Sequence, residues 1–296
     1  MLVTPLPGAD RDHLVNTLKT VRNNIDNMRG PFNGTPYSRL VQYLRWATDS
    51  ARLLRNLVRA EDVTRLVLTR RYDALLSGAA GGFAGSHQEA LLNDLVSLEM
   101  EERVEELDEA AVALKKRGED WDRAGVLVVA DSSVYIQHES KLLDWNFSSL
   151  LGIREERVHL LFPMVVVDEL DNLKQSKERD RRWRAAYTLA VLEKHLTRGT
   201  DFAVIKAADY SGLDSGGVPH GRVSVEILFD PPAHSRLPIN DDEIIDRAVM
   251  VQLVAAQPVR LLTYDTGQAM RARAAGLDVR KLRPAAETEP EPATSK

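Results

Sequence analysis

Short, wholly apolar runs alternate with helical segments in the sequence after Gly125. Val126–Ala130 is the first run, and comparable runs follow at 158–162, Phe202–Lys206 and Val259–Thr263. Runs of this length and composition are typical of strands that are buried on both faces of a parallel sheet. Between them, helices are expected at about 141–151, 164–175, 181–197 and 243–256. The alternation predicts an α/β domain, a three-layer α/β/α fold with a central, mainly parallel sheet.

One further segment of this region has a different pattern. In residues 222–229, apolar Val223 and Val225 alternate with polar Ser224 and Glu226, which predicts a half-exposed strand or a hairpin arm. The segment 212–221 before it is expected to be a loop. The last residues, 284–296, are rich in Ala, Glu, Pro and Thr and are expected to form a disordered tail.

Residues 1–120 have a helical pattern throughout. Apolar side chains such as Leu14, Leu18 and Ile25 recur at helical spacing, and similar patterns predict further helices over about 38–58 and 63–76. The glycine-rich segment 78–85 is expected to be a flexible loop. Ser86 and Glu89 then match a capping box, which begins a helix that runs towards Arg117. Four such helices predict an all-α helical bundle domain, and no residue in it forms a recognisable site.

Composition excludes several classes of protein. The chain has no cysteine, which excludes disulfides, thiolate zinc sites and cysteine nucleophiles. Its apolar runs are far shorter than a membrane span, which needs roughly 18 residues. The first residues show no basic start followed by an apolar stretch, so no signal peptide is expected, and the protein is expected to be cytoplasmic, without a membrane partner. The net charge of −5 by itself argues against a surface coated with charge for nucleic acids.

Acidic residues stand where the predicted strands end. Asp131 directly follows the first run and Asp265 follows the last, while Glu169 lies on the helix after the second. Asp241 and Asp242 begin the helix that leads to the last run. Ligands bind at the carboxyl ends of the strands in open α/β sheets, so four carboxylates are expected to converge there. Their mutual repulsion would be relieved by a divalent cation, and carboxylate oxygens suit Mg²⁺ or Mn²⁺. The alternative for Asp131 and Asp242 is a structural role as helix N-caps.

These segments resemble a PIN domain over about residues 124–283. The segments that carry the resemblance are VVADSS at Asp131, VDELDNLK at Glu169, NDDEII at Asp242 and LTYDTG at Asp265, of which ELDNLK and TYDTG are the most specific. The resemblance implies a metal-dependent ribonuclease fold with an acidic pocket for Mg²⁺ or Mn²⁺, and Asp131, Glu169, Asp242 and Asp265 as its catalytic and metal-binding residues. Residues 1–120 resemble no family.

The chain departs from the family pattern in two ways. Glu169 and Asp242 lie 73 positions apart, farther than in compact members, and the excess falls in 211–237. The Asp241–Asp242 doublet also leaves the third carboxylate ambiguous by one position. Asp242 is favoured because Ile245 then follows at the family's usual offset.

The chemistry expected at this site is in-line hydrolysis of an RNA phosphodiester bond. One metal ion would be held by Asp131 and Asp265 with help from Asp242, and a second, if present, would lie nearer Glu169. Ser133, Thr263 and Asp241 are expected to orient these ligands. The seven histidines show no HxxE or HExxH spacing, and His159 and His195 are expected to be ordinary packing or surface residues.

Basic side chains gather in two stretches beside the acids. Residues 174–198 hold eight basic against three acidic side chains, and residues 268–283 hold five against one. Phosphate contacts supply most of the affinity in sequence-independent binding, so these stretches predict an RNA-binding surface. Trp183 and Tyr187 stand four apart and are expected either to stack on a base or to pack against the sheet. The residues expected to bind RNA are Lys174, Lys177, Arg179, Arg181, Arg182, Arg184, Arg271 and Arg273.

The leading hypothesis is therefore an endoribonuclease that depends on Mg²⁺ or Mn²⁺ and acts on single-stranded or structured RNA. A toxin ribonuclease of a toxin–antitoxin pair would use the same acids, but such toxins resemble a bare PIN domain. An RNA-binding scaffold that has lost activity is a third alternative. Association of two copies through the PIN-like domain or the helical bundle is also an expectation.

Overall fold

The computed structural model describes residues 2–81, 86–153, 156–196, 202–211, 220–231 and 234–283. The chain divides into two compact units. The first comprises residues 1–120 with 253–256, and the second comprises residues 121–252 with 257–296. The predicted tail 284–296 and most of the predicted loop 212–221 lie outside the described residues. Within the described residues, no helix combines the length and apolarity needed to cross a membrane.

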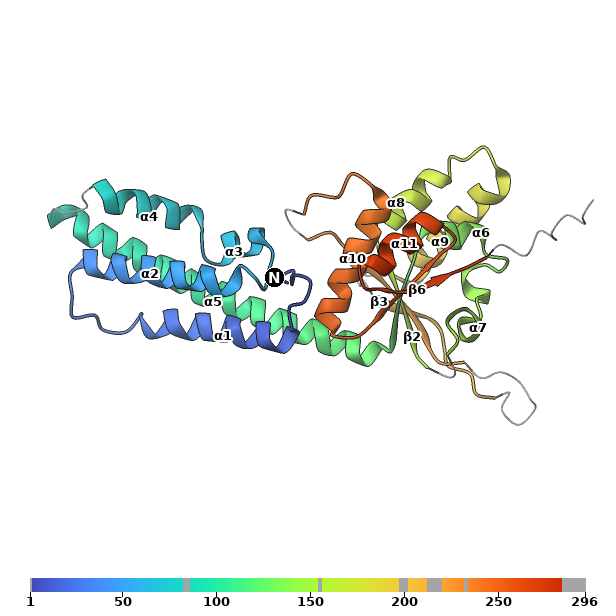
Figure 1. Ribbon diagram of the computed structural model, residues 1–296, viewed down its shortest axis with the longest axis horizontal. Helices are drawn as coiled ribbons and strands as arrows, with labels where there is room; N and C mark the ends of the chain where they lie inside the picture. Colours follow the sequence, from blue (N-terminus) through green and yellow to red (C-terminus); the bar gives the residue numbers. More distant parts are fainter. Residues whose placement is uncertain are drawn as a thin grey trace, which may run out of the picture. The chain divides into compact units, whose positions relative to one another are not determined.

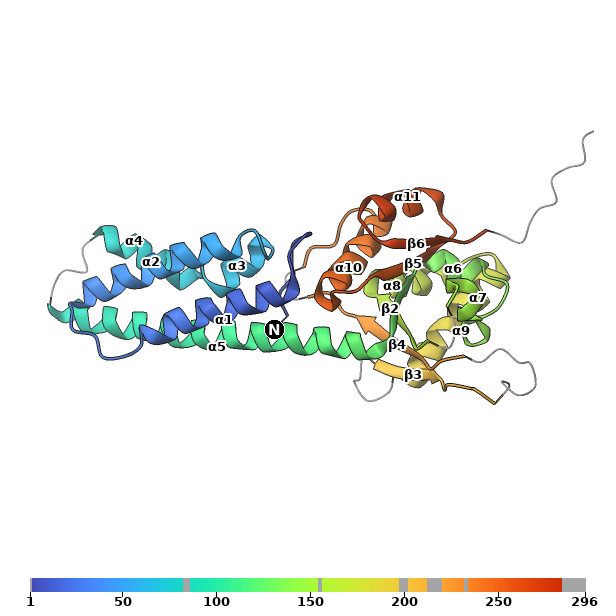
Figure 2. The same cartoon turned by 60° about the horizontal axis from the view of Figure 1, so that its bottom comes forward.

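The first unit is helical, as predicted (Figures 1 and 2). Its apolar side chains at helical spacing are buried: Leu14, Leu18 and Ile25 have no exposed surface. Asp10 caps the first helix, because its side chain accepts a hydrogen bond from the backbone N–H of His13 at 2.7 Å. The helices are α1 (Arg11–Asn27), α2 (Pro36–Leu54), α3 (Ala60–Leu66), α4 (Arg70–Gly81) and α5 (Ser86–Ala124).

Two predictions for this unit were wrong in detail. The helix expected over 63–76 is divided between α3 and α4. Thr69 starts the second piece, because its Oγ1 accepts the backbone N–H of Tyr72 at 3.0 Å and donates to the buried carboxylate of Glu99 at 2.7 Å. Residues 78–81, expected in a loop, continue α4, since Ala79 and Ala80 favour a helix enough to offset the flanking glycines. Residues 82–85 lie outside the described residues, as does the side chain of the Ser86 capping box.

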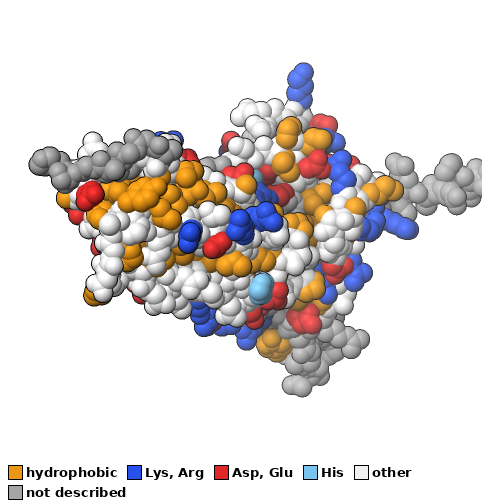
Figure 3. Space-filling view, turned by 60° about the vertical axis from the view of Figure 1, so that its left-hand side comes forward, with side chains coloured by type: hydrophobic (Ala, Val, Ile, Leu, Met, Phe, Trp, Pro, Cys, Tyr) orange, Lys and Arg blue, Asp and Glu red, His pale blue; other side chains and the backbone are white. Residues whose placement is uncertain are grey.

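The helical unit leaves several large apolar side chains at its surface. Leu76 on α4 and Leu91 and Leu98 on α5 are about half exposed. Figure 3 shows hydrophobic side chains gathered on the surface that its view brings forward. Exposed apolar surface of this kind is common at sites of protein association. The expected association of two copies stays a prediction.

The second unit confirms the predicted α/β fold. Its six-stranded sheet has the order β3-β4-β2-β1-β5-β6, and all neighbours are parallel except β3 and β4. β1 and β2 are buried almost throughout, as their apolar sequences predict. Before β1, Gly125 adopts φ +106° where a Cβ would lie 2.3 Å from the carbonyl oxygen of Arg157, so only glycine fits there. The strands are β1 (Val126–Ala130), β2 (Val158–Pro163), β3 (Phe202–Lys206), β4 (Val223–Leu228), β5 (Val259–Thr263) and β6 (Asp278–Lys281).

β4 pairs antiparallel with the preceding strand β3, which confirms the hairpin-arm alternative, whereas the half-exposed alternative is wrong. It lies inside the sheet between β2 and β3, and its polar residues Ser224 and Glu226 are buried. They are satisfied by hydrogen bonds: His159 on β2 bonds to Ser224 Oγ at 2.9 Å and to Glu226 Oε2 at 2.7 Å. Trp121 Nε1 donates to the same Glu226 oxygen at 3.0 Å. The alternation of apolar and polar residues therefore indicated two faces of the strand with different surroundings. The polar face contacts a buried hydrogen-bond network rather than solvent.

Helices cover the sheet and connect its strands (Figures 1 and 2). α6, α8 and α9 pack together, and α11 packs on β5 and β6. The helix predicted over 141–151 was wrong as a single element, because Asn146 caps a separate short helix by accepting the backbone N–H of Ser149. α11 and β6 were not predicted. The helices are α6 (Ser132–Gln137), the 3₁₀ turn η1 (Leu142–Asp144), α7 (Phe147–Leu151), α8 (Met164–Leu173), α9 (Arg179–His195), α10 (Asn240–Ala255) and α11 (Thr266–Ala274).

Candidate active site

The carboxyl ends of β1 and β5 form a topological switch point of the sheet. β1 and β5 are parallel neighbours, with Ala130 paired to Leu262 in register. After β1 the chain continues towards β2 on one side, and after β5 it continues to β6 on the other side. Connections that leave in opposite directions open a crevice at the carboxyl ends of such a pair, where open α/β sheets bind ligands. Asp131 directly follows β1, and Asp265 lies two positions after the end of β5.

Asp131 is buried and held by three hydrogen bonds. Its Oδ1 accepts Ser133 Oγ at 2.6 Å and the backbone N–H of Val134 at 3.1 Å, and its Oδ2 accepts Thr263 Oγ1 at 2.6 Å. Burial raises the pKa of Asp131 to about 6, although these hydrogen bonds act in the opposite direction, and the charge of Asp241 raises it further. The carboxylate is therefore well oriented but poorly neutralised.

Ser133 and Thr263 also connect the Asp131 and Asp265 segments. Ser133 Oγ accepts the backbone N–H of Tyr264 at 3.2 Å, and Thr263 Oγ1 accepts the backbone N–H of Asp265 at 2.8 Å. The exposed Asp265 caps α11 by accepting the backbone N–H of Gln268 at 2.6 Å. Both Asp131 and Asp265 are thus helix N-caps. For Asp131, the predicted role as an N-cap is confirmed, and the same residue also lies at the switch point.

Asp241 lies close enough to the other predicted acids to interact with their charges. The pKa of Asp241 is raised, first by burial, and further by the charges of Asp265, Glu169 and Asp242. The charge of Asp241 also raises the pKa of Asp131. Asp241 thus interacts with every other carboxylate predicted for the site, and its neighbour Asp242 shares the ion-pair partner Arg271 with it. We call Asp131, Glu169, Asp241 and Asp265 the acidic group.

Two polar contacts hold α8, α10 and α11 at this edge. Asn240 Nδ2, at the start of α10, donates to Glu169 Oε1 on α8 at 2.8 Å. Arg271 on α11 pairs with both acids of the doublet, through Nη2 with Asp241 and through Nε with Asp242 at 3.1 Å. Arg271, expected to bind RNA, therefore lies among the acids and lowers the pKa of Asp241, against the larger effect of burial.

Several basic residues of the first stretch are engaged within the protein. Arg184 is only 17% exposed, and it donates through Nη1 and Nη2 to the backbone carbonyls of His138, Glu139 and Ser140. Lys174 pairs with Asp171 at 2.6 Å. Further pairs of the stretch are Arg181 with Glu178, Arg184 with Asp180, and Arg182 Nη1 with the Ser176 carbonyl.

Lys177, Arg179 and Arg273 remain as exposed cations, and no ion-pair partner stands beside them among the described residues. The packing alternative for Trp183 is wrong, because the indole is 52% exposed and stacks on Tyr187 with ring centroids 5.5 Å apart. Lys141 Nζ lies 5.4 Å from the centroid of Tyr187. The outer side of α9 thus carries both positive charge and an exposed aromatic ring.

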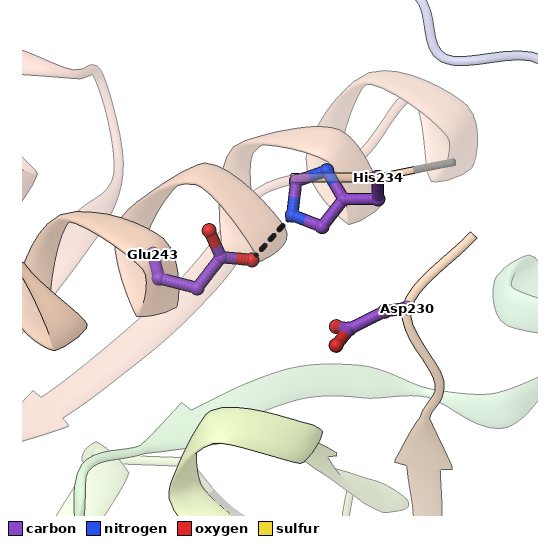
Figure 4. Close-up of side chains that lie close together, drawn as sticks. All are labelled: Asp230, His234 and Glu243. Atoms are coloured by element: carbon purple, nitrogen blue, oxygen red, sulfur yellow. Dashed lines mark hydrogen bonds and ion pairs between the residues drawn. The ribbon is translucent and has the colours of Figure 1, made fainter. Parts of the chain in front are cut away.

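The sequence reasoning missed one group of residues near this edge. Asp230 follows β4, His234 lies in the segment after it, and Glu243 is on α10. Their side chains come together (Figure 4), and His234 Nε2 lies 2.7 Å from Glu243 Oε1. No spacing rule reveals such a group, because a loop of variable length brings the strand end and the helix together.

Comparison with known proteins matches residues 128–283 to the PIN domain family model. No curated protein and no solved structure matches the chain significantly. PIN domains are generally nucleases that act on RNA and usually use Mg²⁺ or Mn²⁺. The match spans more than half of the chain, and its fold is the mainly parallel α/β sheet described above. The chain therefore belongs to the PIN domain family.

Proposed function

We propose that this chain is a metal-dependent endoribonuclease whose reaction centre is the acidic group. The observation that carries the proposal is the surplus of negative charge at the switch point, where burial and neighbouring carboxylates raise the pKa of Asp131 and of Asp241. A divalent cation relieves such repulsion, and a site made of carboxylate oxygens suits Mg²⁺ or Mn²⁺. The residues present therefore fit the ion that PIN domains usually use.

The acidic group supplies the residues that would hold this ion. Asp131, Asp241 and Asp265 would bind it, with Glu169 beside them, and the bound ion would polarise a phosphoryl oxygen and activate water. Ser133 and Thr263 hold the Asp131 carboxylate in one orientation, so little reorganisation is needed when a ligand binds. Compared with the prediction from sequence, Asp241 replaces Asp242 as the third acid.

Exposed cations near the acidic group would hold the substrate. Lys177 and Arg179 at the start of α9 and Arg273 on α11 are exposed cations that would attract the RNA backbone. The same acids would serve a toxin ribonuclease, but no observation in the described residues favours that function. An inactive RNA-binding scaffold would keep the cations and have no use for the acidic group.

Cleavage of labelled single-stranded RNA tests the proposal. With Mn²⁺ or Mg²⁺, the protein should cleave internal bonds, and EDTA should abolish cleavage. Asp131→Asn and Asp265→Asn should each lower the rate by more than about 100-fold, since loss of a residue that only supports a ligand already costs roughly 10–100-fold. Asp144→Asn, a change at an exposed aspartate of η1, is the matched control and should cleave normally.

The doublet provides a sharper comparison within the same assay. Asp241→Asn should lower the rate as strongly as Asp131→Asn, because the charges of Asp265 and Glu169 act on Asp241, whereas Asp242→Asn should lower it by less than about tenfold. Equal losses in the two variants would contradict the choice of Asp241. Cleavage that survives in EDTA, or in all four acidic variants, would contradict the proposed function.

A further inference from the structure

Three side chains outside the acidic group converge at the end of β4. Asp230, His234 and Glu243 each offer one ligand atom, and these atoms all lie within 4.8 Å of one another. In Figure 4 the imidazole of His234 faces the carboxylate of Glu243, and the Asp230 carboxylate lies beside the pair. The side chains of His234 and Glu243 are 7% and 1% exposed, so this is a largely dry site.

We infer that Asp230, His234 and Glu243 form a divalent cation site of the transition-metal type, separate from the acidic group. One imidazole nitrogen and two carboxylate oxygens are ligands that suit Zn²⁺. Mg²⁺ prefers oxygen ligands alone in octahedral geometry, so it fits this set poorly. A fourth position would be left for water.

The carboxylates of this site are already oriented by donors around it. The backbone N–H of Leu237 donates to Glu243 Oε2 at 2.9 Å, and Arg236 Nε donates to Asp230 Oδ2 at 2.6 Å. Arg247 Nε lies 3.4 Å from Glu243 Oε1. Outer contacts of this kind fix the orientation of metal ligands and are typical of built metal sites.

Charge and geometry also favour a cation. Asp230 and Asp168 share a single guanidinium, that of Arg236, so these two carboxylates are not fully neutralised. In a tetrahedral zinc site, ligand atoms stand about 3.3 Å apart, given bonds of about 2.0–2.1 Å. His234 Nε2 and Glu243 Oε1 would separate slightly from 2.7 Å, and Asp230 would approach them by side-chain rotation. The histidine must then carry its proton on Nδ1, so that Nε2 is free to coordinate.

Such a site would fasten the segment after β4 to the start of α10. Glu243 stands two positions after Asp241 on this helix, so the bound ion would restrict the same turn that presents Asp241 to the acidic group. The inference does not depend on nuclease activity, because ion binding can be measured without a substrate.

A zinc titration of the full chain, stripped of metal by a chelator, tests the inference. The titration uses the Asp131→Asn/Asp265→Asn variant, so that the acidic group binds metal weakly. A chromophoric indicator competes with the protein for Zn²⁺. One equivalent of Zn²⁺ should bind and resist millimolar Mg²⁺. Co²⁺ in its place should give the intense visible absorption of a four- or five-coordinate site with a nitrogen ligand.

Adding His234→Ala or Asp230→Asn to this background should weaken Zn²⁺ binding more than tenfold and remove the Co²⁺ absorption. His13→Ala, a change at an exposed histidine of α1, is the matched control and should bind normally. Asp230 is partly exposed, so its variant should fold even if a change at the buried Glu243 does not. Unchanged Zn²⁺ affinity in both variants, or displacement of Zn²⁺ by Mg²⁺, would overturn the inference.

Discussion

At the scale of single residues, Asp131 combines two properties that rarely occur together. It accepts three hydrogen bonds, which favour its charged form, yet burial raises its pKa to about 6. Such a group destabilises the fold whenever it is charged and without a cation. The same property makes it a strong candidate ligand, because a bound ion removes the cost of the buried charge.

The raised pKa predicts how stability depends on pH in the metal-free protein. The unfolded pKa of an aspartate is about 3.9, so the folded state binds more protons between roughly pH 4 and pH 6. The stabilising contribution of protonated Asp131 is fully present below about pH 4 and is lost as the pH rises through about 6.

Asp131→Asn should therefore raise the free energy of unfolding at pH 7.5 by up to about 3 kcal/mol and have little effect below pH 4. Urea unfolding at a series of pH values measures this difference, with Asp144→Asn as the control. Saturating Mn²⁺ should stabilise the wild type and reduce the difference in free energy of unfolding between the wild type and Asp131→Asn. A destabilised Asp131→Asn at pH 7.5 would show that burial does not dominate at this residue.

At the scale of elements, β4 shows how a polar strand becomes an interior one. Its Ser224 and Glu226 face the buried His159 of β2, and Trp121 at the end of α5 completes the network. The network joins β2, β4 and the end of α5. β4 in turn leads directly to Asp230 and the segment before α10, so the network helps to place that turn.

Removing Glu226 should destabilise the sheet strongly. Glu226→Ala leaves the donors of His159 and Trp121 buried without this acceptor, and breaking a buried polar pair costs about 3–5 kcal/mol. Urea unfolding followed by tryptophan fluorescence measures the loss. Glu156→Ala, at an exposed glutamate before β2, should change stability by less than about 0.5 kcal/mol. A loss below about 1 kcal/mol for Glu226→Ala would mean that water replaces the carboxylate.

At the scale of the whole molecule, the net charge of −5 conceals an uneven distribution. Residues 99–122 carry ten acidic against four basic side chains, whereas the two stretches beside the acidic group carry a surplus of basic ones. Within those stretches, contacts in the protein engage Arg184 and Arg271, so the exposed cations and Trp183 remain for a ligand.

RNA binding should therefore separate into an electrostatic part and a stacking part. Lys177→Ala/Arg179→Ala should reduce the slope of log K against log salt concentration by roughly 0.7 for each phosphate that is no longer neutralised, as expected for single strands. Trp183→Ala should weaken binding by about 1–3 kcal/mol without changing the slope. Fluorescence anisotropy with labelled RNA at several salt concentrations measures both.

Lys115→Ala/Lys116→Ala on α5 is the matched control, because it removes two exposed lysines from the helical unit. It should leave affinity and slope unchanged. If the control lowers the slope as much as Lys177→Ala/Arg179→Ala does, the bound RNA does not follow α9.

Local patterns were sufficient for most elements of both units. β1, β3 and β5 have the bounds predicted from their apolar runs, and α8 and α10 differ by a few residues at their ends. Wrong predictions occurred where a local cap divides a helix or where a side chain acts across elements. Thr69 divides a helix, Asn146 caps an unexpected one, and His159 makes the polar face of β4 an interior.

For the site, the sequence indicated which acids follow which strands, because a carboxylate just after a buried parallel strand must lie at the sheet's functional edge. It favoured Asp242 over Asp241 only by a family offset, since one position on a helix rotates a side chain by about 100° and the surroundings of each acid depend on the packing of α10.

The sequence by itself determined the alternation of strands and helices, the family and the acids at the carboxyl edge, because these depend on local periodicity and on residues next to strand ends. Only the tertiary structure decided which cations stay exposed and that Asp230, His234 and Glu243 meet. Each of these depends on contacts between segments distant in the chain, and no local pattern encodes such distances.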